Sequence, residues 1–108
     1  MVVQFAYSEV IESVDAIDDI VHQKVRLGIM SALIACGEGD FKFLRDALGV
    51  TDGNLSIHLS KLEVAGYVSS TKEFVRKKPK TTYRPTDSGK SAFINYLGAL
   101  ERIIHSAG

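Results

Sequence analysis

The sequence is poor in the residues that mark secreted and membrane proteins. Cys36 is the one cysteine among 108 residues, so the chain forms no internal disulfide and a reducing compartment suits it. Polar residues interrupt every apolar stretch well before 18 residues, the length a transmembrane helix needs. The N-terminus has no basic region followed by an apolar run, as a signal peptide would. These absences predict a protein of the cytoplasm.

Composition and length predict one globular domain. Apolar residues make up 45% of the chain and charged residues 24%, which is typical of a folded protein and not of a disordered one. A chain of 108 residues has room for a single modest core. We therefore treat residues 1–108 as one domain.

The sequence also lacks the residue sets of metal sites and enzymes. His22, His58 and His105 are scattered, and none has a partner at the spacing of a metal ligand. No phosphate-binding glycine loop and no Ser/His/Asp or Cys/His set with a recognisable context is present. We therefore predict no enzyme activity, no metal and no cofactor, and we expect His58 to be a partly buried, hydrogen-bonded residue.

The net charge of zero conceals two halves of opposite sign. Residues 1–40 carry seven acidic and two basic residues, a net charge of −5, whereas residues 51–90 carry eight basic and four acidic residues, a net charge of +4. A basic half beside an acidic half suggests that one surface binds a polyanion and another surface does not.

The segment 51–68 predicts a helix with both ends marked. Thr51 is suited to cap the first turn, and Gly66 is suited to the left-handed position that closes a helix. Between them Leu55, Leu59 and Leu62 recur at helical spacing, so one face belongs to the core. The other face carries short, mostly polar side chains, as a helix lying in a DNA groove requires. An ordinary amphipathic surface helix is the alternative.

The preceding segments predict three more helices. A short one spans 8–16 with Ser8 as a cap, and a stronger one spans 18–36, where Asp18 and Asp19 favour the helix start. The third spans 41–48, capped by Asp40. Because only a few residues around Gly49 separate it from the helix at 52–65, the pair forms a helix-turn-helix. Gly28 indicates close helix packing, Phe43 falls outside the inward stripe, and residues 37–40 are expected to form a loop.

After Gly66 the period changes from helical to alternating. Residues 67–75 and 81–86 have the composition of strands, and Arg76-Lys77-Lys78-Pro79-Lys80 separates them. The range 67–86 therefore predicts a hairpin with a basic tip. Pro85 fits the end of a strand or an edge position and not a strand interior. A plain solvated loop is the alternative interpretation of the charge run, but its place directly after a helix-turn-helix favours nucleic acid.

The last helix is expected over 87–105, with Thr86 as cap. Its apolar stripe is wide for a terminal helix, which favours a dimer interface over simple packing on the first helix. The predicted interface residues are Phe93, Tyr96, Leu97, Leu100, Ile103 and Ile104.

The order of these elements, and the blocks TDGNLSIHLSKLEVAGYV and TTYRPTDSGK, resemble the winged helix-turn-helix transcription regulators of the MarR/ArsR kind, in particular a small archaeal and bacterial group. The resemblance covers about residues 19–104. It implies an α+β fold with a three-helix core, a β-hairpin wing and a C-terminal dimerisation helix. It also implies a homodimer that regulates transcription by binding double-stranded DNA.

The resemblance implies a recognition helix in the major groove and a wing on the flanking backbone or minor groove. Ile57 stands where many members have a long polar residue, which leaves Asn54 as the best candidate for a base contact. Lys42 and Arg45 are suited to phosphates. The predicted DNA-binding residues are Thr51, Asp52, Gly53, Asn54, Ser56, Ile57, Ser60, Lys61, Arg76, Lys77, Lys78, Lys80 and Lys42.

Two other functions stay open from the sequence. A winged helix also serves as a protein–protein interaction module, and the acidic first forty residues and Phe43 suit that role. The second open function is that of a regulator that responds to a small molecule bound between the terminal helix and the core. The basic wing and the scarcity of acids on the recognition face favour DNA.

Overall fold

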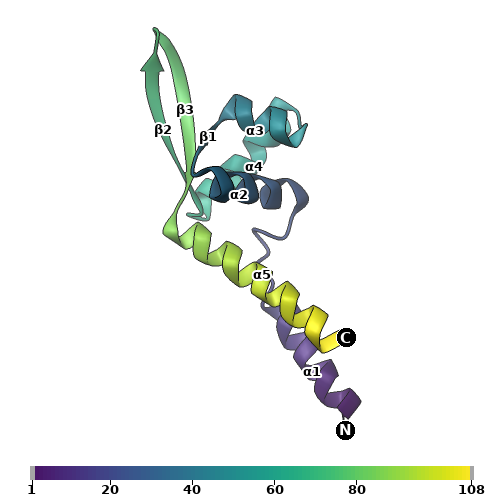
Figure 1. Cartoon of the computed structure of the whole chain (residues 1–108). Coiled ribbons are helices and arrows are strands. Elements are labelled where there is room, and N and C mark those ends of the chain that lie inside the picture. The colour runs from purple at the N-terminus through teal and green to yellow at the C-terminus, as the bar shows by residue number, and fades with distance from the viewer. Residues whose placement is uncertain (1, 108) are drawn as a thin grey trace.

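The computed structural model describes residues 2–107 and the side chains of residues 8–105. It is an α+β winged helix in which five helices accompany a three-stranded antiparallel sheet (Figure 1). The elements in order are α1 (Val2–Asp15), α2 (Lys24–Cys36), β1 (Gly39–Asp40), α3 (Phe41–Leu48), α4 (Asp52–Val64), β2 (Val68–Val75), β3 (Lys78–Pro85) and α5 (Asp87–Ala107).

The core lies where α2, α3 and α4 meet the base of the sheet. Leu55, Leu59 and Leu62 of α4 are all buried, as their spacing predicted. The other members of the buried cluster come from α2, α3 and β2: Ile29, Met30, Leu33, Leu44 and Val68. Gly28 allows α2 to approach α3, because a Cβ there would lie 2.7 Å from Leu48 Cδ2.

Local hydrogen bonds fix both ends of α4. Thr51 Oγ1 accepts a hydrogen bond from Asn54 N at 3.2 Å, which satisfies one of the free amides of the first turn. At the other end Gly66 has φ +79°. There Gly66 N donates to Glu63 O and Tyr67 N donates to Leu62 O, the paired bonds of a Schellman motif. Both predicted caps of this helix are confirmed.

The helix expected at 18–36 begins six residues later, at Lys24. Asp18 does not start a helix: its Oδ1 accepts hydrogen bonds from Ile20 N and Val21 N, a turn that aspartate forms readily. The cap is Gln23, whose side chain accepts from Arg26 N at 2.8 Å. The prediction was wrong because the apolar pattern runs through the turn, where Val21 is also buried.

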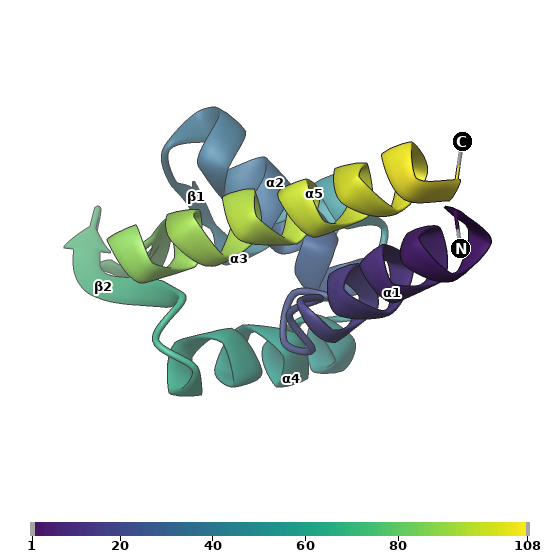
Figure 2. The ribbon, with the colours of Figure 1, turned by 90° about the horizontal axis from the view of Figure 1, so that it is seen from below.

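The helix expected at 8–16 is longer than predicted and begins at Val2, so Ser8 lies within α1 and does not cap it. Helix α5 packs against α1, and the two project together away from the core as an arm (Figures 1 and 2). Packing against α5 stabilises α1, because most helical stability in proteins comes from tertiary contacts.

The sheet has the order β1-β3-β2. Residues 37–40, expected as a loop, include the two-residue strand β1, which pairs Gly39 with Tyr83 and Asp40 with Thr82. Strand β2 pairs with β3 along its whole length, from Val68 opposite Pro85 to Val75 opposite Lys78. Pro85 therefore ends β3, as predicted. The free part of this hairpin is the wing, which extends beyond the helices at the end opposite the arm (Figure 1).

Candidate nucleic-acid interface

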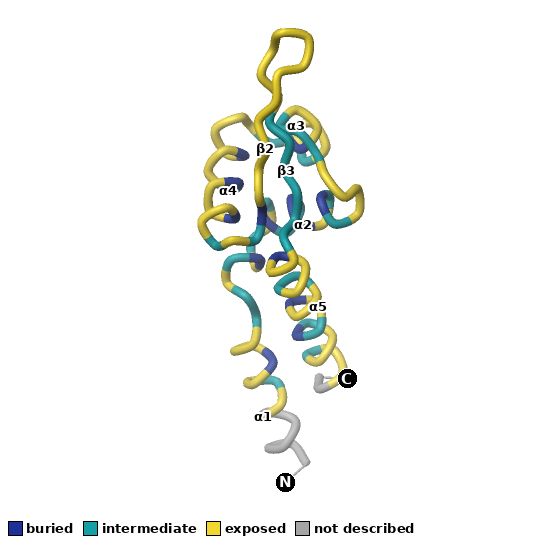
Figure 3. The backbone as a smooth tube through the Cα atoms, turned by 90° about the vertical axis from the view of Figure 1, so that its left-hand side faces the viewer, coloured by how far each residue is buried: buried dark blue, intermediate teal, exposed yellow. Residues whose placement is uncertain are grey.

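The outward face of α4 is open to solvent along its length. All eight predicted residues on or beside this helix are exposed, whereas the three leucines on its other face are buried (Figure 3). The face has short side chains, and its largest apolar group, Ile57, is 59% exposed. The exposed residues are Thr51, Asp52, Gly53, Asn54, Ser56, Ile57, Ser60 and Lys61. A face of this kind fits a major groove without steric obstruction.

An ion pair joins α3 to the start of α4. Arg45 Nη1 lies 3.0 Å from Asp52 Oδ1, and Arg45 Nε lies 3.2 Å from Asp46 Oδ1. Hydrogen bonds to Asp52 and Asp46 raise the pKa of Arg45. Arg45 thus offsets part of the negative charge at the start of the α4 face, which would otherwise repel phosphate. Lys42, on the same helix α3, is exposed.

The wing turns through only two residues. Arg76 and Lys77 have φ values of 54° and 65°, the positive angles that tight hairpin turns need at both central positions. Lys78, Pro79 and Lys80, expected in the tip, belong to β3 instead. The turn was missed because such turns usually carry asparagine and glycine. Arg76 and Lys77 occupy these positions, although residues with side chains adopt positive φ poorly. Their charge therefore lies at the extreme tip of the wing.

Most of the wing charge has no internal partner. Among the described residues, no ion pair involves Arg76, Lys77 or Lys78, whereas Lys80 Nζ lies 3.8 Å from Asp40 Oδ2. Arg84, nearer the base, lies 3.1 Å from Glu38 through Nη2. All five residues from Arg76 to Lys80 are exposed. The tip is therefore a cluster of three unpaired cations that faces solvent, the property that a phosphate contact requires.

A buried arginine supports α4 from within. Arg26 is 9% exposed; its Nε donates to Ile20 O at 2.6 Å, and its Nη1 lies 2.9 Å from His58 Nδ1. Because arginine has only donors, His58 Nδ1 accepts this bond and the imidazole is neutral. Burial and the charges of Arg26 and Lys61 lower the pKa of His58. His58 is thus partly buried and hydrogen-bonded, as predicted. Its bond to Arg26 joins α4 to α2, and Arg26 in turn contacts the turn before α2.

Tyr67 forms a second connection between α4 and that turn. Its hydroxyl donates to Asp18 Oδ2 at 2.5 Å. This bond, together with burial and the charge of Asp18, raises the pKa of Tyr67 to about 12. The backbone oxygen of Tyr67 accepts from Thr86 N at 3.0 Å, immediately before α5. The C-terminal end of α4 is therefore joined both to the α1–α2 turn and to the start of the arm.

The structure separates the six predicted dimerisation residues into two groups. Tyr96 is buried within the chain, where its hydroxyl lies 2.9 Å from His22 Nδ1, and Phe93 packs on the core. Both side chains therefore have contacts within the chain itself, and their place in a dimer interface stays a prediction. Leu97 and Ile104 are exposed, while Leu100 and Ile103 are half-buried. The sequence could not separate the two groups. Along its length, the same apolar stripe of α5 contacts the core, then α1, and also faces solvent.

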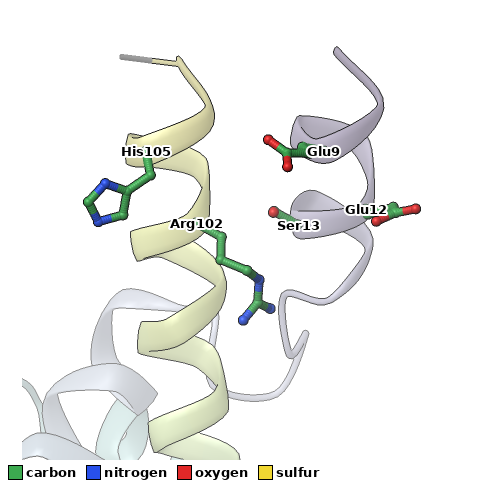
Figure 4. Close-up of a pocket in the computed structure, with 5 residues that line it drawn as sticks. All are labelled: Glu9, Glu12, Ser13, Arg102 and His105. Carbon is green, nitrogen blue, oxygen red and sulfur yellow. The ribbon is translucent and has the colours of Figure 1, made fainter. Parts of the chain in front are cut away.

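A cavity of about 490 Å³ opens between α1 and α5 and is lined by Glu9, Glu12, Ser13, Arg102 and His105. Arg102 extends toward α1, whereas Glu12 and His105 point away from the gap (Figure 4). The polar groups of a small-molecule site converge on one point. The five lining residues here do not all point into the gap (Figure 4). The described part of the chain also has no cluster of three or more His, Cys, Asp or Glu placed to hold a metal ion.

The sequence did not predict three features of this interface: the Arg45–Asp52 pair, the hydrogen bond from Arg26 to His58, and the exposure of Phe74, which is 81% exposed. An arginine inside the apolar pattern of α2 and a phenylalanine beside a basic run are the signals that point to the last two.

In residues 2–107, no helix has the length and apolar content needed to cross a bilayer.

Comparison with known proteins agrees with this geometry. Residues 25–104 match the family model described as a winged helix DNA-binding domain. The chain is 37% identical over 78 residues to the Methanocaldococcus jannaschii protein MJ0432, an alignment that covers 72% of this chain and 85% of that protein.

Two solved structures share the fold. A transcriptional regulator homologue from Pyrococcus horikoshii OT3 has a TM-score of 0.80 and 30% identity, with 93% of this chain and 97% of that chain covered. The Bacillus subtilis protein YusO has a TM-score of 0.72 and 17% identity, with 94% of this chain and 70% of that chain covered. The second likeness concerns the fold alone.

Proposed function

Because the chain belongs to the family of winged helix DNA-binding domains and resembles a transcriptional regulator homologue over nearly its whole length, we propose that it regulates transcription in the cytoplasm by binding double-stranded DNA as a homodimer. Helix α4 enters the major groove, and the wing lies on the flanking backbone. One observation carries this proposal: the exposed face of short side chains on α4 and the unpaired cations at Arg76, Lys77 and Lys78 occur together in one domain.

The chemistry of the wing cations and of the α4 side chains suits them to different roles in DNA binding. The cations neutralise phosphates and supply affinity that does not depend on sequence. Asn54, at the exposed start of α4, has the amide that pairs with adenine, and Ile57 offers an apolar contact for a thymine methyl group. Because the α4 face has no arginine to pair with guanine, the shape of the DNA contributes to sequence preference.

The arm supports the dimer. The molecule is 67 Å long and at most 25 Å wide in the other directions, and the outer side of α5 carries Ile94, Leu97 and Ile104, which are 67%, 46% and 69% exposed. An apolar stripe of this kind on a projecting helix suits a second copy of the chain. Two copies would present their α4 helices to half-sites roughly 34 Å apart.

Fluorescence anisotropy of labelled duplex DNA, repeated over a range of salt concentrations, tests the proposal. The wild-type protein should bind with a slope of log affinity against log salt near −0.9 for each phosphate neutralised. The variant Lys77→Glu/Lys78→Glu should bind every duplex more weakly. Its slope should be shallower by about 3.6, because two phosphate contacts are lost in each of the two subunits.

The variant Lys24→Glu/Lys90→Glu is the matched control, because it makes the same change in net charge at exposed positions outside the wing and α4. It should retain most of the affinity and the wild-type slope. Equal losses in the two variants would show that only total charge matters and would contradict the wing assignment. If the wild-type protein binds no duplex even at low salt, the function lies in protein interaction.

A further inference from the structure

The two faces of the wing differ in chemistry. In β2 and β3, Phe74 stands opposite Pro79 and Val75 opposite Lys78, so Phe74 and Pro79 share one face and Val75 lies on the other. The Phe74 face is the one that continues from the core: Val68, on the same face, is buried, and Ser70 Oγ donates to Glu63 Oε2 of α4 at 3.3 Å. We call Phe74 and Pro79, on the α4 side of the wing, the inner pair.

The inner pair lies beyond the reach of the core. Phe74 is 81% exposed, and Pro79 is exposed as well. Scattered exposed apolar residues are normal, but the surroundings of this pair are specific. The turn cations Arg76 and Lys77 and the strand cation Lys78 follow Phe74 within four residues. A purely apolar partner surface would have to bury these three cations. A polyanion whose phosphates flank apolar groups matches both the cations and the apolar pair.

We propose that the inner pair enters the DNA minor groove next to the major groove that holds α4, and that Phe74 contacts the base edges there. This inference rests on the proposed function. The minor groove is about 6 Å wide with walls of deoxyribose, and proteins that use it commonly insert phenylalanine, proline and other apolar side chains. Arg76, Lys77 and Lys78 then lie beside the phosphates that border the groove, so charge holds the wing while Phe74 makes an apolar contact.

Tryptophan fluorescence locates this contact directly, because the natural chain has no tryptophan. Phe74→Trp places a single fluorophore on the inner face, and Val75→Trp places one on the outer face at the neighbouring residue. With saturating duplex, acrylamide should quench Trp at position 74 several-fold less than in free protein, because DNA covers it. The change at position 75 should be clearly smaller.

Affinity measurements distinguish an apolar contact from an ionic one. Phe74→Ala should weaken binding about tenfold while leaving the salt slope unchanged, because no phosphate contact is lost. Val75→Ala, the control on the outer face, should bind like the wild type. A shallower slope for Phe74→Ala would mean that the change disturbs the cations, and the inference would then be wrong.

Inosine identifies the groove. Replacing guanine by inosine removes the 2-amino group from the minor groove and leaves the major-groove edge unchanged. A duplex with inosine–cytosine pairs should therefore shield Trp at position 74 better than its guanine–cytosine counterpart. Equal shielding on both duplexes would place the contact outside the minor groove. Wild-type binding without any shielding at position 74 would overturn the inference and leave the proposed function standing, whereas no wild-type binding would remove both.

Discussion

At the scale of single residues, the hydrogen bond between Arg26 and His58 connects the interior to the proposed recognition helix. Arg26 reaches His58 at 2.9 Å and Ile20 O at 2.6 Å, so one buried guanidinium holds both α4 and the turn before α2. A buried charge left without its partners is costly. The position of α4 therefore depends on an imidazole that accepts a hydrogen bond, which it can do only when it is neutral.

This contact predicts that folding depends on pH near neutrality. The folded state lowers the pKa of His58 below its ordinary value of 6.5, whereas the unfolded chain has no such effect. Between the lowered and the ordinary value the unfolded state binds more protons, so stability falls as pH falls. We expect the free energy of unfolding, measured with urea, to be highest above about pH 6.5 and to decline below it.

The variant His58→Gln isolates this effect, because glutamine keeps a hydrogen-bond acceptor and does not titrate. Its stability should change less between pH 7.5 and 5.5 than that of the wild type, with His22 and His105 present in both proteins as an internal reference. Identical pH profiles would mean that Arg26 does not hold His58 in its neutral form.

At the scale of elements, the approach of α5 to the end of α4 depends on the absence of one side chain. Gly89, in the first turn of α5, is buried, and a Cβ there would lie 2.1 Å from Tyr67 O. That oxygen belongs to a rigid backbone bonded to Thr86 N, so it cannot move aside as a side chain can. Gly89 is needed for the space that its missing side chain leaves, and not for backbone freedom. This need becomes visible only when α5 is placed against Tyr67.

Gly89→Ala should therefore destabilise the protein by about 1–3 kcal/mol, the usual cost of inserting a group into a packed site. Gly98→Ala in the same helix is the matched control, because its nearest neighbour, the end of the Arg102 side chain, would lie 3.6 Å away. Alanine there should stabilise the protein by about 0.5–1 kcal/mol. Urea denaturation of both variants gives the comparison; a similar gain in stability for both would show that α5 does not approach Tyr67 this closely.

At the scale of the whole molecule, the arm carries the proposed dimer interface and projects away from the proposed DNA-binding end (Figure 1). The chain buries its core beside the sheet and extends α1 and α5 away from it (Figure 1). Helix α5 packs on α1 along one side and exposes Leu97 and Ile104 on another. These two exposed residues, rather than Tyr96 and Phe93, are the positions at which substitution separates association from folding.

Leu97→Asp/Ile104→Asp should give a monomer of 11.8 kDa by light scattering, where the wild type should have twice that mass. Helical content should be unchanged because neither side chain is buried in the core. Val64→Asp, at a position that is 90% exposed on α4, is the control and should remain a dimer. A wild type that is already monomeric would exclude this interface.

The sequence alone determined the elements whose ends are fixed by neighbouring residues. Thr51 and Gly66 bound α4, and Asp40 and Gly49 bound α3, because each makes its capping contacts within a few residues along the chain. The period of Leu55, Leu59 and Leu62 likewise revealed which face of α4 is buried. The helix-turn-helix and the face proposed to read DNA were therefore predictable from local patterns.

Only the tertiary structure decided the features that join residues distant in sequence. Asp18 leaves the helical path to bind Tyr67, 49 residues away, so the start of α2 was misplaced. Strand β1 exists because β3 lies beside it, and Tyr96 is withdrawn from the exposed stripe by His22. The side of the wing that carries Phe74 is set by pairing register and by packing on α4. Each of these outcomes depends on a partner that no local pattern specifies, because contact free energy arises only when the chain brings both groups together.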